Sequence, residues 1–184
     1  PKGWVVDNET AGYNTIVGEN LLGQAFTTAH TRTAASSGAF NFPLQLGRSA
    51  PSPVVYRDAA NVNLFYWINR AHDLFYGLGF NEGAGNFQSD NYGRGGAGGD
   101  PVLAYTHYGA AAAGGPALSN AFFSTRSNAD GGAAMVAMYA SSSGAGGFMT
   151  DGAYAGDVIL HEYTHGVSLR LLPDGYGSFQ TAAM

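Results

Sequence analysis

The chain has 184 residues, of which 45% are hydrophobic, so it is long enough for one folded domain and too apolar for a disordered polymer. Its net charge of −5, with only 8 Lys and Arg residues, argues against a nucleic-acid partner. No apolar run approaches the roughly 20 residues that span a bilayer, so no membrane partner is expected.

Cysteine is absent from the chain. Disulfide scaffolds, iron–sulfur clusters and thiolate metal sites are therefore excluded, and any metal must be bound by His and carboxylates. Only 11% of the residues are charged and 28 are Gly, which predicts a chain rich in loops.

The first segment, residues 1–57, is predicted to be β-rich. Four short β-prone pieces alternate there with Gly, Pro and Ser, at residues 5–6, 24–28, 39–42 and 54–56. No stronger periodic pattern occurs in this segment, so we expect short strands joined by loops.

A long helix is predicted next, over residues 59–78 within the segment 58–80. Leu64, Ile68 and Ala71 recur at the helical period, and Asp58 is placed to cap the N-terminus. Apolar and aromatic residues fill most of its positions, which predicts a helix buried on most sides.

Residues 81–156 are predicted to combine Gly-rich loops with the strands of a sheet. The expected strands cover residues 102–108, 119–124 and 134–140, with loops at 81–101, 110–115 and 141–156. The Gly-rich run at 93–100 lacks the Gly-Lys-Ser/Thr ending of a phosphate-binding loop, so a loop that wraps the core is the better interpretation.

A second helix is predicted over residues 157–172, and Pro173 stops it. Asp157 is placed to cap its N-terminus or to favour the helix dipole. His161 and His165 are spaced i, i+4 on this helix, so one helical turn brings both imidazoles to the same side.

Two neutral imidazoles on one side of a helix suit a zinc ion. Glu162 follows the first of them and can lie beside the metal, where it can take a proton from the attacking water and later deliver it to the leaving amine. Gly166 permits close packing directly after the second His. The alternative is two ordinary hydrogen-bonded histidines and a surface glutamate.

Longer stretches around this motif strengthen the zinc interpretation. The helix at 156–171 reads Gly-Asp-Val-Ile-Leu-His-Glu-Tyr-Thr-His-Gly-Val-Ser-Leu-Arg-Leu, and residues 63–69 read Asn-Leu-Phe-Tyr-Trp-Ile-Asn. Together with 84–88 and 91–96, these stretches resemble the fungalysin family of secreted zinc metallopeptidases, which are thermolysin-like gluzincins.

The resemblance implies an α+β fold, namely a thermolysin-like N-terminal subdomain with a curved antiparallel sheet, a long buried helix and the active-site helix at the floor of a cleft. Residues 1–184 would then be the N-terminal part of the catalytic domain, whose helical C-terminal half is absent. The implied function is a secreted, extracellular zinc endopeptidase that hydrolyses peptide bonds by a metal-activated water, with Glu162 as general base.

The resemblance also suggests two substrate-binding residues. Asn120 and Ala121 are similar to the Asn-Ala pair of the thermolysin edge strand, which implies that they bind the backbone of a peptide or protein substrate. The alternative for Asn120 is an ordinary residue at a strand end.

One metal ligand is not found in the expected place. Gluzincins take a Glu from a later helix, whereas the other glutamates here are Glu9, Glu19 and Glu82, all upstream. We therefore expect one catalytic zinc completed by a companion chain or segment that continues after Met184, with Asp174 as a weaker alternative. Structural Ca²⁺ is possible for such a protein, but the sequence does not indicate it.

A rival interpretation is a non-catalytic peptide-binding protein or an inactive fragment of such an enzyme. The three remaining histidines are predicted to be buried, hydrogen-bonded core residues: His30, His72 and His107. Neither His30 nor His107 has ligand-type spacing.

Overall fold

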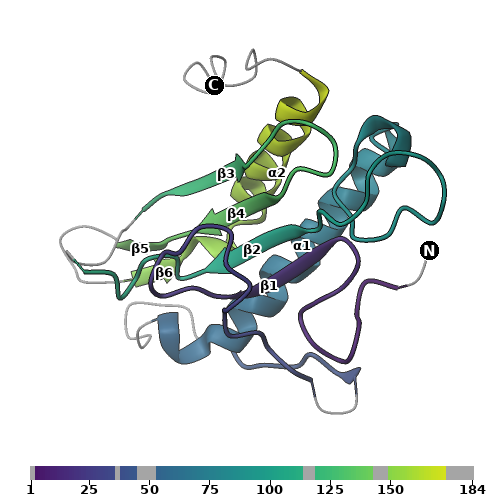
Figure 1. The fold of residues 1–184 in the computed structure, drawn as a ribbon. Helices are drawn as coiled ribbons and strands as arrows, with labels where there is room; N and C mark the ends of the chain where they lie inside the picture. Colours follow the sequence, from purple (N-terminus) through teal and green to yellow (C-terminus); the bar gives the residue numbers. More distant parts are fainter. Residues whose placement is uncertain (1–2, 36–37, 45–52, 114–118, 143–148, 173–184) are drawn as a thin grey trace.

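A four-stranded sheet and two long helices form the framework of the molecule (Figure 1). The computed structural model describes residues 3–35, 38–44, 53–113, 119–142 and 149–172. The sheet has the order β1-β2-β4-β3. Its strands are β1 (Thr15–Glu19), β2 (Val102–Thr106), β3 (Ala121–Thr125) and β4 (Ala134–Met138).

The sheet is mixed, so the prediction of an antiparallel sheet is wrong. β1 and β2 pair in parallel, as do β2 and β4, and only β3 and β4 are antiparallel. The cause lies in the connection between β1 and β2, which contains the long helix and returns the chain to the starting end of the sheet. The α+β class itself agrees with the separate helices and sheet.

Of the described residues among the first 57, one strand belongs to the main sheet, and it is not one of the four predicted pieces. β1 at Thr15–Glu19 is buried on both faces, and none of the residues 5–6, 24–28 and 39–42 belongs to a named strand. Residues 54–56 lie in a 3₁₀ helix, η2 (Pro53–Tyr56). The strand position is decided by pairing with β2 more than by local propensity.

The three downstream strands were predicted to within two residues at both ends. The predicted loop at 141–156 is partly wrong, because β5 (Ala140–Ser142) pairs with β6 (Met149–Asp151). A 3₁₀ helix, η4 (Gly152–Tyr154), then leads into the second long helix.

Both long helices were predicted to within two residues, as α1 (Arg57–Gly77) and α2 (Gly156–Leu171). Neither Asp58 nor Asp157 is an N-cap, because Tyr56 and Ala155 occupy these positions without a side-chain hydrogen bond. For Asp157, the alternative prediction of a charge that favours the helix dipole agrees with its place in the first turn. Asp58 and Asp157 instead lie in the first turns, where a negative charge still favours the helix dipole.

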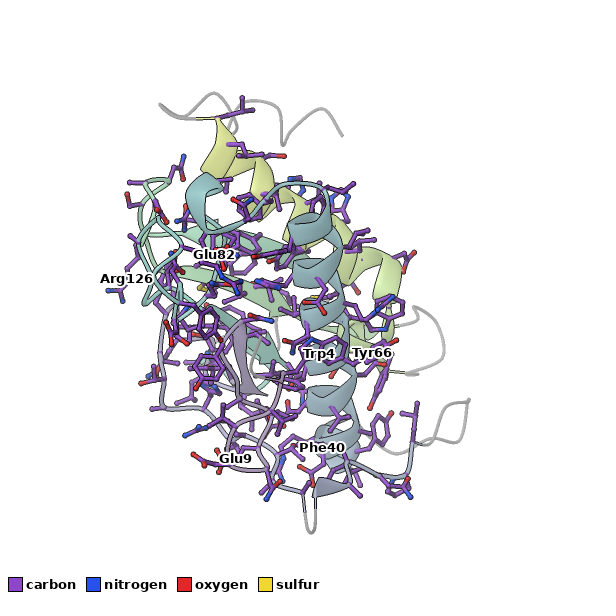
Figure 2. All side chains as sticks on the ribbon, turned by 90° about the vertical axis from the view of Figure 1, so that its right-hand side faces the viewer. Trp4, Glu9, Phe40, Tyr66, Glu82 and Arg126 are labelled. Atoms are coloured by element: carbon purple, nitrogen blue, oxygen red, sulfur yellow. The ribbon has the colours of Figure 1, made fainter. Side chains whose placement is uncertain are left out.

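Helix α1 is buried along one face instead of on most sides. Leu64, Ile68 and Ala71 are buried in the main core, whereas Leu74 is 50% exposed. On the outer face, the rings of Trp4 and Tyr66 meet edge to face at 5.8 Å (Figure 2). Within the described residues, no helix combines the length and apolarity that crossing a membrane requires.

Candidate metal and catalytic site

His161 and His165 point together from one side of α2. Their Nε2 atoms are 2.9 Å apart, and their rings are nearly perpendicular, at 89°. A point exists that is about 2.0–2.1 Å from both nitrogens, which is the usual zinc–nitrogen distance. The pair therefore fits two ligands of one zinc ion, and the donor type is the one that zinc prefers.

Glu162 lies on the inner side of the same helical turn and is only 7% exposed. Burial raises the pKa of its carboxyl group, while the two neighbouring imidazoles and the backbone amide of Phe123 oppose the rise. A carboxylate with a raised pKa is a stronger proton acceptor, as a general base requires.

Helix α2 packs closely on strand β3 because Gly166 has no side chain. A Cβ at this position would come within 2.4 Å of the ring of Phe123, so only Gly fits without movement of the ring. The expected close packing after the second His is thus observed. At the start of α2, Gly156 makes a similar approach to Trp67 of α1, where a Cβ would lie 2.6 Å from the indole.

Asn120 directly precedes β3, and Ala121 is its first residue. Asn120 is exposed; its backbone carbonyl accepts a hydrogen bond from Tyr139 N–H at 3.1 Å, and its side-chain Oδ1 accepts one from Ala121 N–H at 2.9 Å. Because β3 is an edge strand, one side of it has no strand partner among the residues that the structure describes. Figure 1 shows this strand alongside α2.

Among the described residues, a third metal ligand is not found near the pair. Across the residues that the structure describes, no group of three His, Asp or Glu side chains is placed to hold a metal. Asp174 lies outside the described residues. The three upstream glutamates contact other groups: Glu9 contacts Arg32, Glu19 contacts His107, and Glu82 contacts Arg94.

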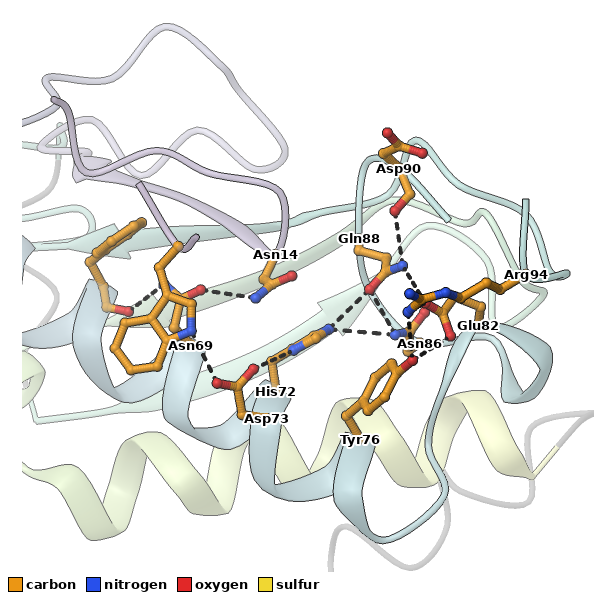
Figure 3. Close-up of polar contacts among 12 residues, drawn as sticks. Asn14, Asn69, His72, Asp73, Tyr76, Glu82, Asn86, Gln88, Asp90 and Arg94 are labelled. Carbon is orange, nitrogen blue, oxygen red and sulfur yellow. Dashed lines mark hydrogen bonds and ion pairs between the residues drawn. The ribbon is translucent and has the colours of Figure 1, made fainter. Parts of the chain in front are cut away.

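His72 is buried and hydrogen-bonded, as predicted. Its Nε2 lies 3.2 Å from Gln88 Oε1, and its Nδ1 lies 3.2 Å from the carboxylate of Asp73 (Figure 3). The network continues through Gln88 to Glu82, which also accepts a hydrogen bond from the Tyr76 hydroxyl at 2.9 Å. These contacts join α1 to the loop that follows it.

His107 is also buried, and it connects three segments. Its Nδ1 lies 2.8 Å from Glu19 at the end of β1, and its Nε2 lies 2.6 Å from Asp151 at the end of β6. Burial alone would lower the pKa of His107, but the two carboxylates raise it to about 9. His30 is only half-buried, and its Nδ1 lies 3.2 Å from the carbonyl of Thr27.

Two parts of this region were not predicted from the sequence. One is the backbone amide of Phe123, which faces Glu162, and the other is Arg170, which is buried near the end of α2. The sequence does not show which backbone amide will face a given side chain. An arginine in the last turn of a helix ordinarily indicates a solvent-exposed, dipole-favouring charge, so only the three-dimensional structure reveals its burial.

Comparison with known proteins shows which family the chain is similar to. Residues 1–180 match the family described as "Fungalysin metallopeptidase (M36)". The chain is 36% identical over 173 residues to "Extracellular metalloproteinase 4" of Arthroderma gypseum, covering 91% of this chain and 25% of that protein.

Two further relatives are similar to the same extent. "Extracellular metalloproteinase MEP" of Fusarium vanettenii is 37% identical over 175 residues, covering 91% of this chain and 25% of the relative. "Probable extracellular metalloproteinase 4" of Arthroderma benhamiae is 38% identical over 170 residues, covering 92% of this chain and 24% of the relative. The chain thus spans about a quarter of the length of these curated relatives.

Proposed function

The chain belongs to the fungalysin family of metallopeptidases, and on this premise we propose that it carries the catalytic helix of a secreted zinc endopeptidase. The observation that carries the proposal is the pair of imidazole nitrogens 2.9 Å apart on α2, with the buried Glu162 between them in the sequence. The names of the relatives, which are extracellular metalloproteinases, support an extracellular location.

His161 and His165 would hold the zinc ion through their Nε2 atoms. When bound, zinc supplies a Lewis acid that polarises the scissile carbonyl group and acidifies water. Two protein ligands are fewer than the three that catalytic zinc sites normally have. We assign the third to a glutamate in a segment that continues after Met184, since the relatives are about four times as long as the match.

Glu162 acts as the general base in this proposal. Its carboxylate takes a proton from the attacking water and returns it to the amine nitrogen of the leaving peptide. Burial keeps the carboxylate poorly solvated, and the amide of Phe123 contacts it from the edge strand. That contact links the base to the strand along which a peptide would lie.

The substrate would lie along the free edge of β3. An extended peptide can add to an edge strand through backbone hydrogen bonds, which accounts for binding with little dependence on side-chain identity. Asn120 and Ala121 stand at the start of this strand, and the exposure of Asn120 supports a role in binding peptide backbone. Both residues are therefore assigned to substrate binding.

The proposal is tested by peptide cleavage with the full-length protein carrying Glu162→Gln. The amide cannot take a proton, so cleavage should fall by roughly 10²–10⁴-fold while the fold and the zinc content are kept. Asp157→Asn, an exposed acid on the same helix, is the matched control and should keep the wild-type rate.

Near-wild-type cleavage by the Glu162→Gln protein would remove Glu162 from the reaction. A wild-type protein that binds peptides without cleaving them would support the rival interpretation of a non-catalytic binding protein.

A further inference from the structure

Arg170 is a buried cation in the last turn of α2, on the same helix as the proposed zinc ligands. Its side chain is 1% exposed, and its Nη1 lies 3.0 Å from Oδ2 of Asp100, whose side chain is fully buried. Its Nη2 donates to the backbone carbonyl of Gly132 at 2.9 Å. Its guanidinium also lies over the ring of Phe87, at 4.6 Å from the ring centroid.

The partners of Arg170 come from two segments outside the helix. Asp100 lies at the end of the Gly-rich loop, two residues before β2, whereas Asp130 and Gly132 belong to the turn that joins β3 to β4. Asp130 Oδ1 lies 3.4 Å from Arg170 Nη1, and Asp130 Oδ2 accepts a hydrogen bond from Ala97 N–H at 2.6 Å. One guanidinium therefore joins the end of α2, the Gly-rich loop and the β3–β4 turn.

The contacts of Arg170 need the planar, multi-donor shape of arginine. The fork of the guanidinium satisfies an aspartate and a backbone carbonyl in different directions at the same time, and it lies over an aromatic ring. Gly85 has a left-handed backbone and makes room for the stem of Arg170, which a Cβ there would meet at 3.3 Å. A lysine ammonium is a compact point charge that cannot reproduce this set of contacts.

Helix α2 is thus fixed against β3 and its turn at two places. Gly166 meets Phe123 in the helix body, and Arg170 binds the β3–β4 turn near the helix end. Two separated contacts define both the rotation of the helix about its axis and its position along the strand. Glu162 lies one turn before the first of these places, with its carboxylate against the amide of Phe123.

We propose that Arg170 is a positioning residue that sets α2 against the edge strand, and thereby holds Glu162 at the place where the peptide is attacked. The inference rests on the proposed function, because it assigns the residue to the alignment of base and substrate. Misplacement of a reacting group by about 1 Å can cost on the order of 100-fold in rate. A peptide can still add to the strand when the helix has moved, so the effect should be on kcat more than on KM.

The test compares Arg170→Gln and Asp130→Asn with wild type in the full-length, zinc-loaded protein. Rates are expressed per folded, zinc-containing molecule, so that partial unfolding does not count as lost catalysis. We expect kcat to fall by about tenfold or more for Arg170→Gln, with KM nearly unchanged, and by less for Asp130→Asn, which keeps the Asp100 contact. Arg170→Lys should not restore kcat.

A matched control separates alignment from stability. Val17→Ala removes buried volume from β1, at the opposite edge of the sheet from β3. It should lower stability while leaving kcat per folded molecule unchanged. Wild-type kcat per folded molecule in both Arg170→Gln and Asp130→Asn would overturn the inference, as would an equal fall in Val17→Ala.

A second readout does not depend on catalysis. Hydrogen exchange at the amide of Phe123 should become faster in Asp130→Asn and Arg170→Gln than in Val17→Ala, because that amide faces Glu162 across the contact between helix and strand. Unchanged exchange in both variants would also contradict the inference. If the wild-type protein cleaves no peptide but these exchange differences are observed, the proposed function fails while the positioning of the helix by Arg170 stands.

Discussion

The ring of Phe123 on β3 lies directly against Gly166 on α2, so closely that a methyl group at position 166 would come within 2.4 Å of it. This contact brings the proposed catalytic helix onto the edge strand. It also explains why a glycine, which weakens a helix interior, follows the second histidine.

Replacing Gly166 with Ala should therefore destabilise the fold, although Ala favours helices. Displacing the Phe123 ring should cost roughly 1–3 kcal/mol of unfolding free energy. Gly77→Ala is the matched control, because Gly77 is the last residue of α1 and a Cβ there would meet no other atom within 4 Å. This substitution should be neutral or should stabilise the fold by up to about 1 kcal/mol. Denaturant unfolding measures both, and equal stability of the two variants would show that the contact is not tight.

A second prediction concerns the buried His107, whose pKa is raised to about 9 by Asp151 and Glu19 against the effect of burial. A pKa raised above the ordinary value of about 6.5 means that the protonated form is favoured by folding. The stabilisation is therefore complete below about pH 6.5 and is lost as the pH rises through about 9, and its order of magnitude is about 3 kcal/mol.

The measurement for His107 is the free energy of unfolding between pH 6 and about pH 10. Wild type should lose more stability over this range than His107→Gln, which has no proton to release. The groups that face the imidazole are the carboxylates of Glu19 and Asp151. Parallel pH curves for the two proteins would show that His107 is not charged in the fold.

The helices could be predicted from the sequence because their signals are local. Leu64, Ile68 and Ala71 repeat at the helical period, and glycines or a proline end both segments. The strand β1 was missed because Thr15–Glu19 is short, and its place depends on pairing with a strand 87 residues later along the chain. Parallel pairing is likewise a property of the connection, which local propensity does not encode.

For the candidate site, too, the local features could be predicted from the sequence and the contacts between distant segments could not. The spacing of His161 and His165 fixes their side of the helix, so the sequence alone brings their imidazoles together. The amide of Phe123 comes from a segment about 40 residues away in the chain, and the partners of Arg170 come from two further segments. Such contacts depend on the packing of α2 on the sheet, for which no local pattern exists.

A third prediction concerns substrate binding at the edge strand. Asn120→Ala in the full-length protein should weaken peptide binding or turnover by roughly 1–3 kcal/mol, which corresponds to one or two lost hydrogen bonds. Asn128→Ala, in the turn after the other end of β3, is a control of the same residue type and should leave peptide kinetics unchanged. Identical kinetics of Asn120→Ala and wild type on several peptides would remove Asn120 from the site.

The central claim is that His161 and His165 bind zinc, and the most direct measurement is the zinc content of the purified full-length protein. The account predicts close to one zinc per wild-type molecule, retention of that zinc in Glu162→Gln, and its loss in both His161→Ala and His165→Ala. Elemental analysis that finds no transition metal in the wild type, or an unchanged zinc content when either histidine is replaced, would contradict the account.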